Sequence, residues 1–239
     1  MSLNLSIGTW NLDRSGIRGQ GRIAGQLSKL LDLVADVWVL TETHSSIVLK
    51  GYHAVSSEPD PCYHEKDESC ASIWSRCPLT LIEVENPVYS VCAELQPENL
   101  AQKLMVYGTI ITYRDDGVDE GAAPWERHRE AVQKQTAEWK HLRERYPNHL
   151  FCVAGDFNMN LDTGPYWYGL KEEKEKLKDG LLRAGLHCAT CVDTRQPPFG
   201  LSRATVDHIC INQELSSCIK LEAWEDKKLS DHNGMLIRL

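Results

Sequence analysis

Residues 151–158 read FCVAGDFN and join an apolar run to a carboxylate and an amide. The run 151–155 has the short apolar pattern of a buried strand, and it ends at Asp156, with Asn158 two residues further on. Ligands bind at the carboxyl ends of strands in open α/β sheets. The stretch therefore predicts a core strand with a candidate site at its end.

Other predicted strands also end in polar side chains. Strand 3–11 ends at Asn11, the run 36–42 ends at Glu42, and the run 104–113 ends at Tyr113. Each residue alone is explained as a turn residue or a cap. Together with residues 151–158 they predict a rim at which an amide, carboxylates and a phenol meet.

A further carboxylate lies inside an apolar strand. In residues 205–211, TVDHICI, Asp207 shares a face with Ile209 and Ile211. A buried carboxylate costs several kcal/mol unless it is paired. His232, just before the last predicted strand, would supply the partner and would be oriented by it. The alternatives are a turn or cap role for Asp207 and a structural role for His232.

These residue types suit metal-assisted attack of water on phosphorus. Hard oxygen ligands prefer Mg²⁺ or Mn²⁺ to the thiolate sites typical of zinc. Such a cation would neutralise a phosphate oxygen, and His232 would act as general base or as electrostatic partner of the transition state. The candidate oxygen ligands are Glu42, Asp156 and Asp231, with Asn11 and Asn158 as neutral partners.

Composition narrows the class of protein. The chain has 239 residues, 42% hydrophobic and 25% charged, which fits one globular domain spanning 1–239. With a net charge of −8, the protein lacks the overall positive charge that attracts nucleic acid. A polyanionic substrate must therefore be held by local basic residues or by a bound cation. Without a signal peptide or a membrane-spanning run, we expect a cytoplasmic monomer whose nine cysteines are mostly reduced.

Periodicity predicts an α/β protein. Apolar stripes at helical spacing predict helices over 22–34, 124–146 and 168–184. Polar stretches at 57–70 and 113–123 predict surface loops. The many strands and few helices indicate two packed sheets with helices outside. The predicted strands are 3–11, 36–42, 52–56, 71–76, 88–95, 104–113, 149–156, 205–211, 218–224 and 234–239.

Six segments together resemble the endonuclease/exonuclease/phosphatase superfamily. They follow one another along nearly the whole chain and include GDFN at 155–158, VDHI at 206–209 and SDH at 230–232; the others are 9–12, 36–43 and 71–79. The resemblance implies a four-layer α/β/β/α sandwich of two mostly antiparallel sheets.

The resemblance also implies the metal ligands. Glu42 would be the main Mg²⁺ ligand, helped by Asn11. Asp231 would support the metal or its waters, and Asp156 would bind a second metal or activate the attacking water.

Catalytic roles follow from the same resemblance. Asn158 would position the phosphate, and His232 would contact it with Asp207 behind the ring. Tyr113 lies where the family often has a residue that touches the phosphate. Threonine at position 41 and the residues around Tyr113 depart from the AP-endonuclease pattern, so the resemblance does not extend to that branch.

Weaker signals have ordinary alternatives. Arg14, Arg18 and Arg22 lie in a glycine-bearing loop that is either a phosphate clamp or a solvated loop. The aromatic triplet 166–168 is either a stacking platform for a base or ordinary packing. The pair Cys188 and Cys191 has no matching second pair, which favours buried thiols over zinc.

The leading hypothesis is a Mg²⁺-dependent phosphoester hydrolase, with nucleic acid as the expected substrate class. One alternative is a phosphatase or phosphodiesterase acting on a small or lipid-linked phosphate. Another is a non-catalytic binding module on the same fold. Cleavage of a panel of nucleic acids and small phosphoesters, with Mg²⁺ and with EDTA, would distinguish them.

Overall fold

The structure is a computed structural model that describes residues 5–14, 19–162, 164 and 168–239. Its α-helices are α2 (Gln20–Leu33), α3 (Glu126–Arg145) and α4 (Lys171–Arg183), with short 3₁₀ helices η1 (Val118–Glu120) and η2 (Gln213–Cys218). Its strands are β1 (Ser6–Asn11), β2 (Val37–His44), β3 (His53–Ser56), β4 (Glu68–Ser75), β5 (Leu79–Ile82), β6 (Ser90–Leu95), β7 (Leu104–Ile110), β8 (Leu150–Asp156), β9 (Leu186–Cys188), β10 (Asp207–Asn212), β11 (Lys220–Trp224) and β12 (Gly234–Arg238).

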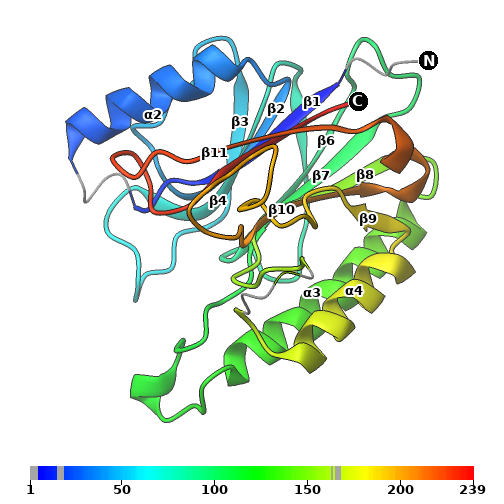
Figure 1. Cartoon of the computed structure of the whole chain (residues 1–239). Helices are drawn as coiled ribbons and strands as arrows, with labels where there is room; N and C mark the ends of the chain where they lie inside the picture. The colour runs from blue at the N-terminus through cyan, green and yellow to red at the C-terminus, as the bar shows by residue number, and fades with distance from the viewer. Residues whose placement is uncertain (1–4, 15–18, 163, 165–167) are drawn as a thin grey trace.

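The strands form two six-stranded sheets (Figure 1). The first has the order β11-β12-β1-β2-β4-β3, and the second has the order β5-β6-β7-β8-β10-β9. Each sheet contains one parallel pair, β1 with β2 and β7 with β8, and the other pairs are antiparallel. The expectation of two mostly antiparallel sheets is confirmed.

Three apolar cores hold the layers together. The core between the sheets contains Ile7, Val39 and Ile209 from strands of both sheets. A second core lies between the second sheet and α3 with α4, and a third lies between the first sheet and α2. Figure 1 shows α2 on one side of the sheets and α3 with α4 on the other. The predicted α/β/β/α layering is therefore correct.

The two parallel pairs position the candidate site. A parallel pair needs a crossover connection, which α2 supplies between β1 and β2 and α3 supplies between β7 and β8. Asn11 ends β1 opposite Thr41 of β2, and Asp156 ends β8 opposite Ile110 of β7. Polar strand ends of both sheets thus reach one rim of the sandwich.

Some strand boundaries differ from the sequence prediction. The edge strands β5 and β9 were not predicted, because they are only four and three residues long and carry no clear alternation. Strand β4 begins at Glu68, inside the predicted loop 57–70, and β7 ends at Ile110. Tyr113 therefore lies in the turn after β7, in which the Asp116 N–H donates to the Tyr113 carbonyl at 3.3 Å.

A glycine is required directly before the site. Gly155 has φ of +135°, and a Cβ at this position would overlap the carbonyl oxygen of Thr109 on β7. Only glycine adopts this backbone conformation without strain. The residue allows β7 and β8 to pair closely up to Asp156.

None of the helices in the described residues is long and apolar enough to cross a membrane.

Candidate active site

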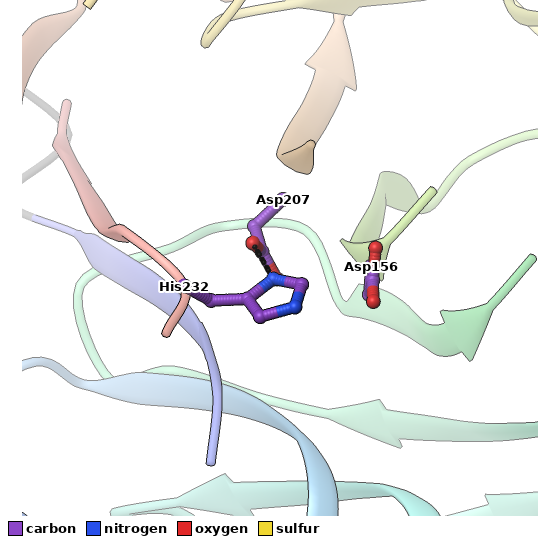
Figure 2. Close-up of side chains that lie close together, drawn as sticks. All are labelled: Asp156, Asp207 and His232. Atoms are coloured by element: carbon purple, nitrogen blue, oxygen red, sulfur yellow. Dashed lines mark hydrogen bonds and ion pairs between the residues drawn. The ribbon is translucent and has the colours of Figure 1, made fainter. Parts of the chain in front are cut away.

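Asp207 and His232 form a buried hydrogen-bonded pair. The Asp207 Oδ2 lies 2.7 Å from the His232 Nδ1, and the Asp207 carboxylate is inaccessible to solvent. A dashed line marks this contact in Figure 2. Asp207 is the first residue of β10, on the face that continues into the core as Ile209 and Ile211. The sequence expectation that His232 accompanies the buried carboxylate agrees with this contact.

The segment before β12 fixes the His232 backbone against β1. The Ser230 hydroxyl donates to the Asn11 carbonyl at 2.6 Å and accepts from the His232 N–H at 3.0 Å. The Trp10 indole donates to the His232 carbonyl at 3.2 Å. These contacts give Ser230 and Trp10 positioning roles that the sequence reading did not identify, although the run SDH drew attention to Ser230.

Asp156 lies beside this pair and is itself buried. It is the direct antiparallel partner of Asp207, so the two carboxylates extend from adjacent strands toward the same space (Figure 2). Its Oδ1 accepts from the Asn158 N–H at 2.8 Å, and its Oδ2 accepts from the Asn11 Nδ2 at 3.0 Å. Asn158 also donates from Nδ2 to the Ile111 carbonyl at 2.9 Å. The network fixes Asp156 and Asn158 in one arrangement.

Burial and neighbouring charges shift the protonation of these groups. Burial raises the pKa of Asp156 to about 7; the Asp207 charge adds to this rise, and His232 opposes it. Burial by itself would lower the pKa of His232, but the charges of Asp207 and Asp156 outweigh it and raise the pKa to about 10. Burial also raises the pKa of Asp207, against the effect of His232. The imidazole is therefore an imidazolium at neutral pH.

Glu42 joins the cluster through Asn11. The Asn11 Nδ2 donates to the Glu42 Oε1 at 3.1 Å, so one amide group bridges Glu42 and Asp156. The Asn11 Oδ1 accepts from the Asp13 N–H at 2.8 Å. Burial raises the pKa of Glu42, with the hydrogen bond from Asn11 opposing this effect and the charge of Asp156 adding to it. In this arrangement Asn11 orients the two carboxylates.

Glu42 and Asn158 both have strained backbones. Each has φ of +47°, in the left-handed region that residues with a Cβ seldom adopt. Such conformations cost about 1–3 kcal/mol and cluster at functional sites. Asn adopts this region more readily than Glu does, so Glu42 carries the larger strain of the two.

The cluster fits a divalent cation. Asp156, Asp207 and His232 each offer a ligand atom, all within 4.8 Å of one another. Because His232 is protonated and paired with Asp207, its ring is a poor ligand. The carboxylates of Asp156 and Glu42 are hard oxygen donors of the kind that Mg²⁺ prefers, and burial raises both pKa values, with repulsion from a neighbouring carboxylate adding to the rise. A cation between them would relieve this repulsion.

Two predicted site residues lie at the margin of the cluster. The side chain of Asp231 is 60% exposed, and its Oδ1 lies 3.8 Å from the His232 Nε2. Tyr113 is 46% exposed and lines a cavity together with Glu42 and Asn158. Both residues border the site without entering the hydrogen-bonded network described above.

A cleft of about 530 Å³, including its open mouth, borders the Asp207–His232 pair on the His232 side. Arg203 lines this cleft and donates from Nη1 to the Asp231 carbonyl. The sequence reading missed Arg203, whose only signal was a lone arginine four residues before Asp207. Tyr168 also lines the cleft, while residues 166–167 of the predicted stacking triplet lie outside the described residues.

The predicted arginine clamp divides into separate contacts. Arg22 is held by Asp13 and by the Leu229 carbonyl, which is a structural role. Arg14 pairs with Glu68 at 2.6 Å, beside the cavity that Glu42, Asn158 and Tyr113 line. Arg18 lies outside the described residues.

Cys188 and Cys191 are free thiols. The Cys191 Sγ lies 2.8 Å from the Leu161 carbonyl. His187 is exposed, and both cysteines are partly buried. Among the described residues, the group of side chains placed to hold a metal ion contains neither cysteine.

Solved structures with the same architecture come from several sources. The AP endonuclease LMAP from Leishmania major has a TM-score of 0.70 at 15% identity, covering 98% of this chain and 88% of that chain. The 3′ phosphatase NExo from Neisseria, bound to a product DNA hairpin, has a TM-score of 0.67 at 16% identity, with coverages of 98% and 99%. The endonuclease domain of TRAS1, a telomere-specific non-LTR retrotransposon, has a TM-score of 0.63 at 17% identity, with coverages of 99% and 98%.

At these identities the structural likeness establishes the fold. No curated protein sequence matches the chain significantly. The sequence does match a protein family over residues 8–232, a span that contains the strand ends, the Asp207 strand and the SDH segment. The chain therefore belongs to the Endonuclease/Exonuclease/phosphatase family.

Proposed function

We propose that the protein is a Mg²⁺-dependent hydrolase that cleaves nucleic-acid phosphodiesters by attack of water. The observation that carries this proposal is the meeting of Asp156 with the Asp207–His232 pair at one rim, beside Glu42. The site combines a carboxylate of raised pKa, a fixed imidazolium and an excess of negative charge. This combination suits metal-assisted attack of water on a phosphoester.

Asp156 is the group proposed to activate water. Burial keeps its pKa near 7, where a carboxylate is basic enough to take a proton from water in neutral solution. Hydrogen bonds from Asn11 and Asn158 fix the direction of its lone pairs. The carboxylate is therefore preorganised toward the space that a phosphate would occupy.

His232 is proposed to hold the phosphate. Its Nδ1 is engaged by Asp207, so the Nε2–H remains for a phosphate oxygen, and the positive charge favours the dianionic transition state. Asn158 would support the site by fixing Asp156, because its side-chain amide already donates to the Ile111 carbonyl and to Asp156. Glu42 would hold Mg²⁺ with Asp156. When bound, Mg²⁺ supplies positive charge that neutralises the phosphate oxygens and the leaving oxygen.

Nucleic acid is the proposed substrate class for two reasons. One related structure holds a DNA hairpin product, and others are of an AP endonuclease and of a retrotransposon endonuclease domain. The cleft beside His232 also carries Arg203 and Tyr168, a cation and an aromatic ring suited to a phosphate and a base. With a net charge of −8, such local contacts must provide the attraction for a polyanion.

The test is hydrolysis of a substrate panel by wild type and by Asp156→Asn. The panel contains single- and double-stranded DNA, RNA, abasic DNA, and small phosphodiesters and monoesters, each with Mg²⁺, Mn²⁺ or EDTA. We expect Mg²⁺-dependent cleavage of at least one nucleic acid and a loss of at least about 10³-fold in Asp156→Asn.

The matched control is Asp32→Asn, which changes an exposed carboxylate of α2 and should leave the rate unchanged. Cleavage of only the small phosphoesters would refute the nucleic-acid assignment. Full activity in EDTA would refute the metal dependence.

A further inference from the structure

A second cavity opens on the Glu42 side of the site. It encloses about 660 Å³, including the open solvent at its mouth. Glu42 and Asn158 line it, and Asn158 also lines the cleft beside His232, so the two cavities adjoin. The rest of the wall comes from the segment before β4 and from the turn after β7, which carries Tyr113 and Asp116. None of the functions assigned above uses this space.

The charges around this cavity disfavour a phosphate. Of the described residues that line it, one is an arginine, Arg14, and its guanidinium is already paired with Glu68 at 2.6 Å. The histidine of the wall, His64, has a pKa lowered by burial and is neutral at physiological pH. The carboxylates of the wall are Glu42, Asp60, Glu68 and Asp116. An uncharged group that donates hydrogen bonds suits this surface better than an anion does.

Three lining residues hold polar atoms without a hydrogen-bond partner among the described residues: Glu68 Oε1, Thr112 Oγ1 and Asp116 Oδ2. Glu68 is 3% exposed and Thr112 is 7% exposed, so water satisfies these atoms poorly. Leaving a buried acceptor unpaired costs about 1–3 kcal/mol. The other oxygens of Glu68 and Asp116 are already paired with Arg14 and with Arg127, which lies 3.3 Å from Asp116 Oδ1. A ligand that brings N–H donors to the two remaining oxygens would remove that cost.

Aromatic rings form another part of the same wall. Tyr63, Tyr89 and Tyr113 line the cavity, and the Arg14 guanidinium lies 4.7 Å from the centre of the Tyr63 ring. Tyr63 and Tyr113 are 52% and 46% exposed, which leaves ring surface free for stacking. Stacking of a base on an aromatic side chain contributes about 1–3 kcal/mol. The wall thus combines π surfaces with carboxylate acceptors.

We infer that this cavity binds a nucleobase of the substrate strand, stacked on Tyr63 and Tyr113, whose exocyclic amine donates to Asp116 and Glu68. The inference rests on the proposed function, because Glu42 at the cavity wall would hold the metal at the cleaved phosphate. Cytosine, adenine and guanine carry such an amine, whereas thymine and uracil present a carbonyl in its place. The cavity would therefore select the base next to the cleavage site.

The test compares the binding of short fluorescent oligodeoxycytidylate and oligodeoxythymidylate by anisotropy, in EDTA to prevent turnover. A good base contact discriminates by about 1–3 kcal/mol, so wild type should prefer the cytidylate by about tenfold or more. Asp116→Asn should reduce this preference to within about threefold, because an amide presents a donor as well as an acceptor. Tyr63→Leu should weaken the binding of both oligonucleotides by a similar factor, because stacking on the ring does not distinguish cytosine from thymine.

The matched control is Asp115→Asn, which changes an exposed carboxylate of the same turn that does not line the cavity. It should retain the full preference, and melting curves should show that every variant is folded. Equal binding of the two oligonucleotides by wild type, or a preference that survives in Asp116→Asn, would overturn the inference. Displacement of the oligonucleotide by free cytidylate at equal nucleotide concentration would also overturn the inference. In that case the cavity would be a site for mononucleotides and not for a base of the substrate strand.

Hydrolysis of the same oligonucleotides with Mg²⁺ separates this inference from the proposed function. A cytidylate preference in binding without any hydrolysis would contradict the proposed function and leave the base pocket supported. Hydrolysis without a preference would contradict the base pocket alone.

Discussion

The Asp207–His232 pair gives the sharpest prediction, which is that Asp207→Asn lowers the pKa of His232. In the wild type, the carboxylate charge at 2.7 Å outweighs burial and raises that pKa to about 10. The amide keeps a similar shape but supplies no charge, so burial then offsets the remaining charge of Asp156 and the pKa should fall to about 6.5. The difference corresponds to an interaction of about 5 kcal/mol, in the range for breaking a buried ion pair.

The assay is an NMR titration of the histidine rings in metal-free protein, with His232→Gln identifying the resonance. Activity gives an independent readout. If the imidazolium is the active form, the rate of wild type should not fall as the pH rises from about 7 to about 9, while at pH 8.5 only about one Asp207→Asn molecule in a hundred keeps the proton. The rate of the variant should therefore fall about 100-fold between pH 6 and pH 8.5, relative to wild type.

Stability should follow the same linkage. The folded-state pKa of His232 is raised, so its protonation stabilises the fold fully below about pH 6.5, and this contribution is lost as the pH rises through about 10. The stability advantage of wild type over Asp207→Asn should shrink across that range in urea unfolding. A His232 pKa near 6.5 in wild type, or one unchanged in the variant, would refute the reasoning.

Three other perturbations test the site and its support. Glu42→Ala should weaken Mg²⁺ binding at least tenfold by calorimetry without lowering the melting temperature, because the change removes a partly buried carboxylate. Unchanged Mg²⁺ affinity would exclude Glu42 as the main ligand. His208 is buried with its pKa lowered to about 4, so it should contribute about 3 kcal/mol of stability near pH 7 that is lost as the pH falls from about 6.5 to 4. His208→Gln should remove that part of the acid sensitivity in urea unfolding, and an unaltered pH profile would contradict the assignment. Gly155→Ala should lower the free energy of unfolding by about 3 kcal/mol or more, because φ is +135° and the added Cβ would meet the Thr109 carbonyl. A loss below about 1 kcal/mol in urea unfolding would show that β7 and β8 can separate at this position.

The sequence determined those features that depend on neighbours along the chain. The predicted helices over 22–34, 124–146 and 168–184 are confirmed within a few residues, because an amphipathic stripe is a local property of the helix. Side chains in a strand alternate between its two faces, and this two-residue period placed Asp207 correctly on the face of Ile209 and Ile211. Side-chain direction within a strand is thus encoded locally.

Sequence reasoning missed features that depend on edge pairing. Strands β5 and β9 are held mainly by their pairing with β6 and β10, and so short a segment carries no usable periodicity of its own. The end of β7 at Ile110 likewise depends on where its pairing with β8 stops, at Asp156. Hydrogen bonds between distant segments determine these boundaries.

Only the tertiary structure decided how the candidate site is assembled. The sequence could propose that strand ends meet, but the order of strands in the two sheets determines that Asp156 lies opposite Asp207 and that Asn11 reaches both Asp156 and Glu42. The protonated state of His232 also depends on this assembly, because burial and neighbouring charges act through space. Periodicity specifies which way a side chain points, whereas long-range pairing and core packing determine which side chains it meets.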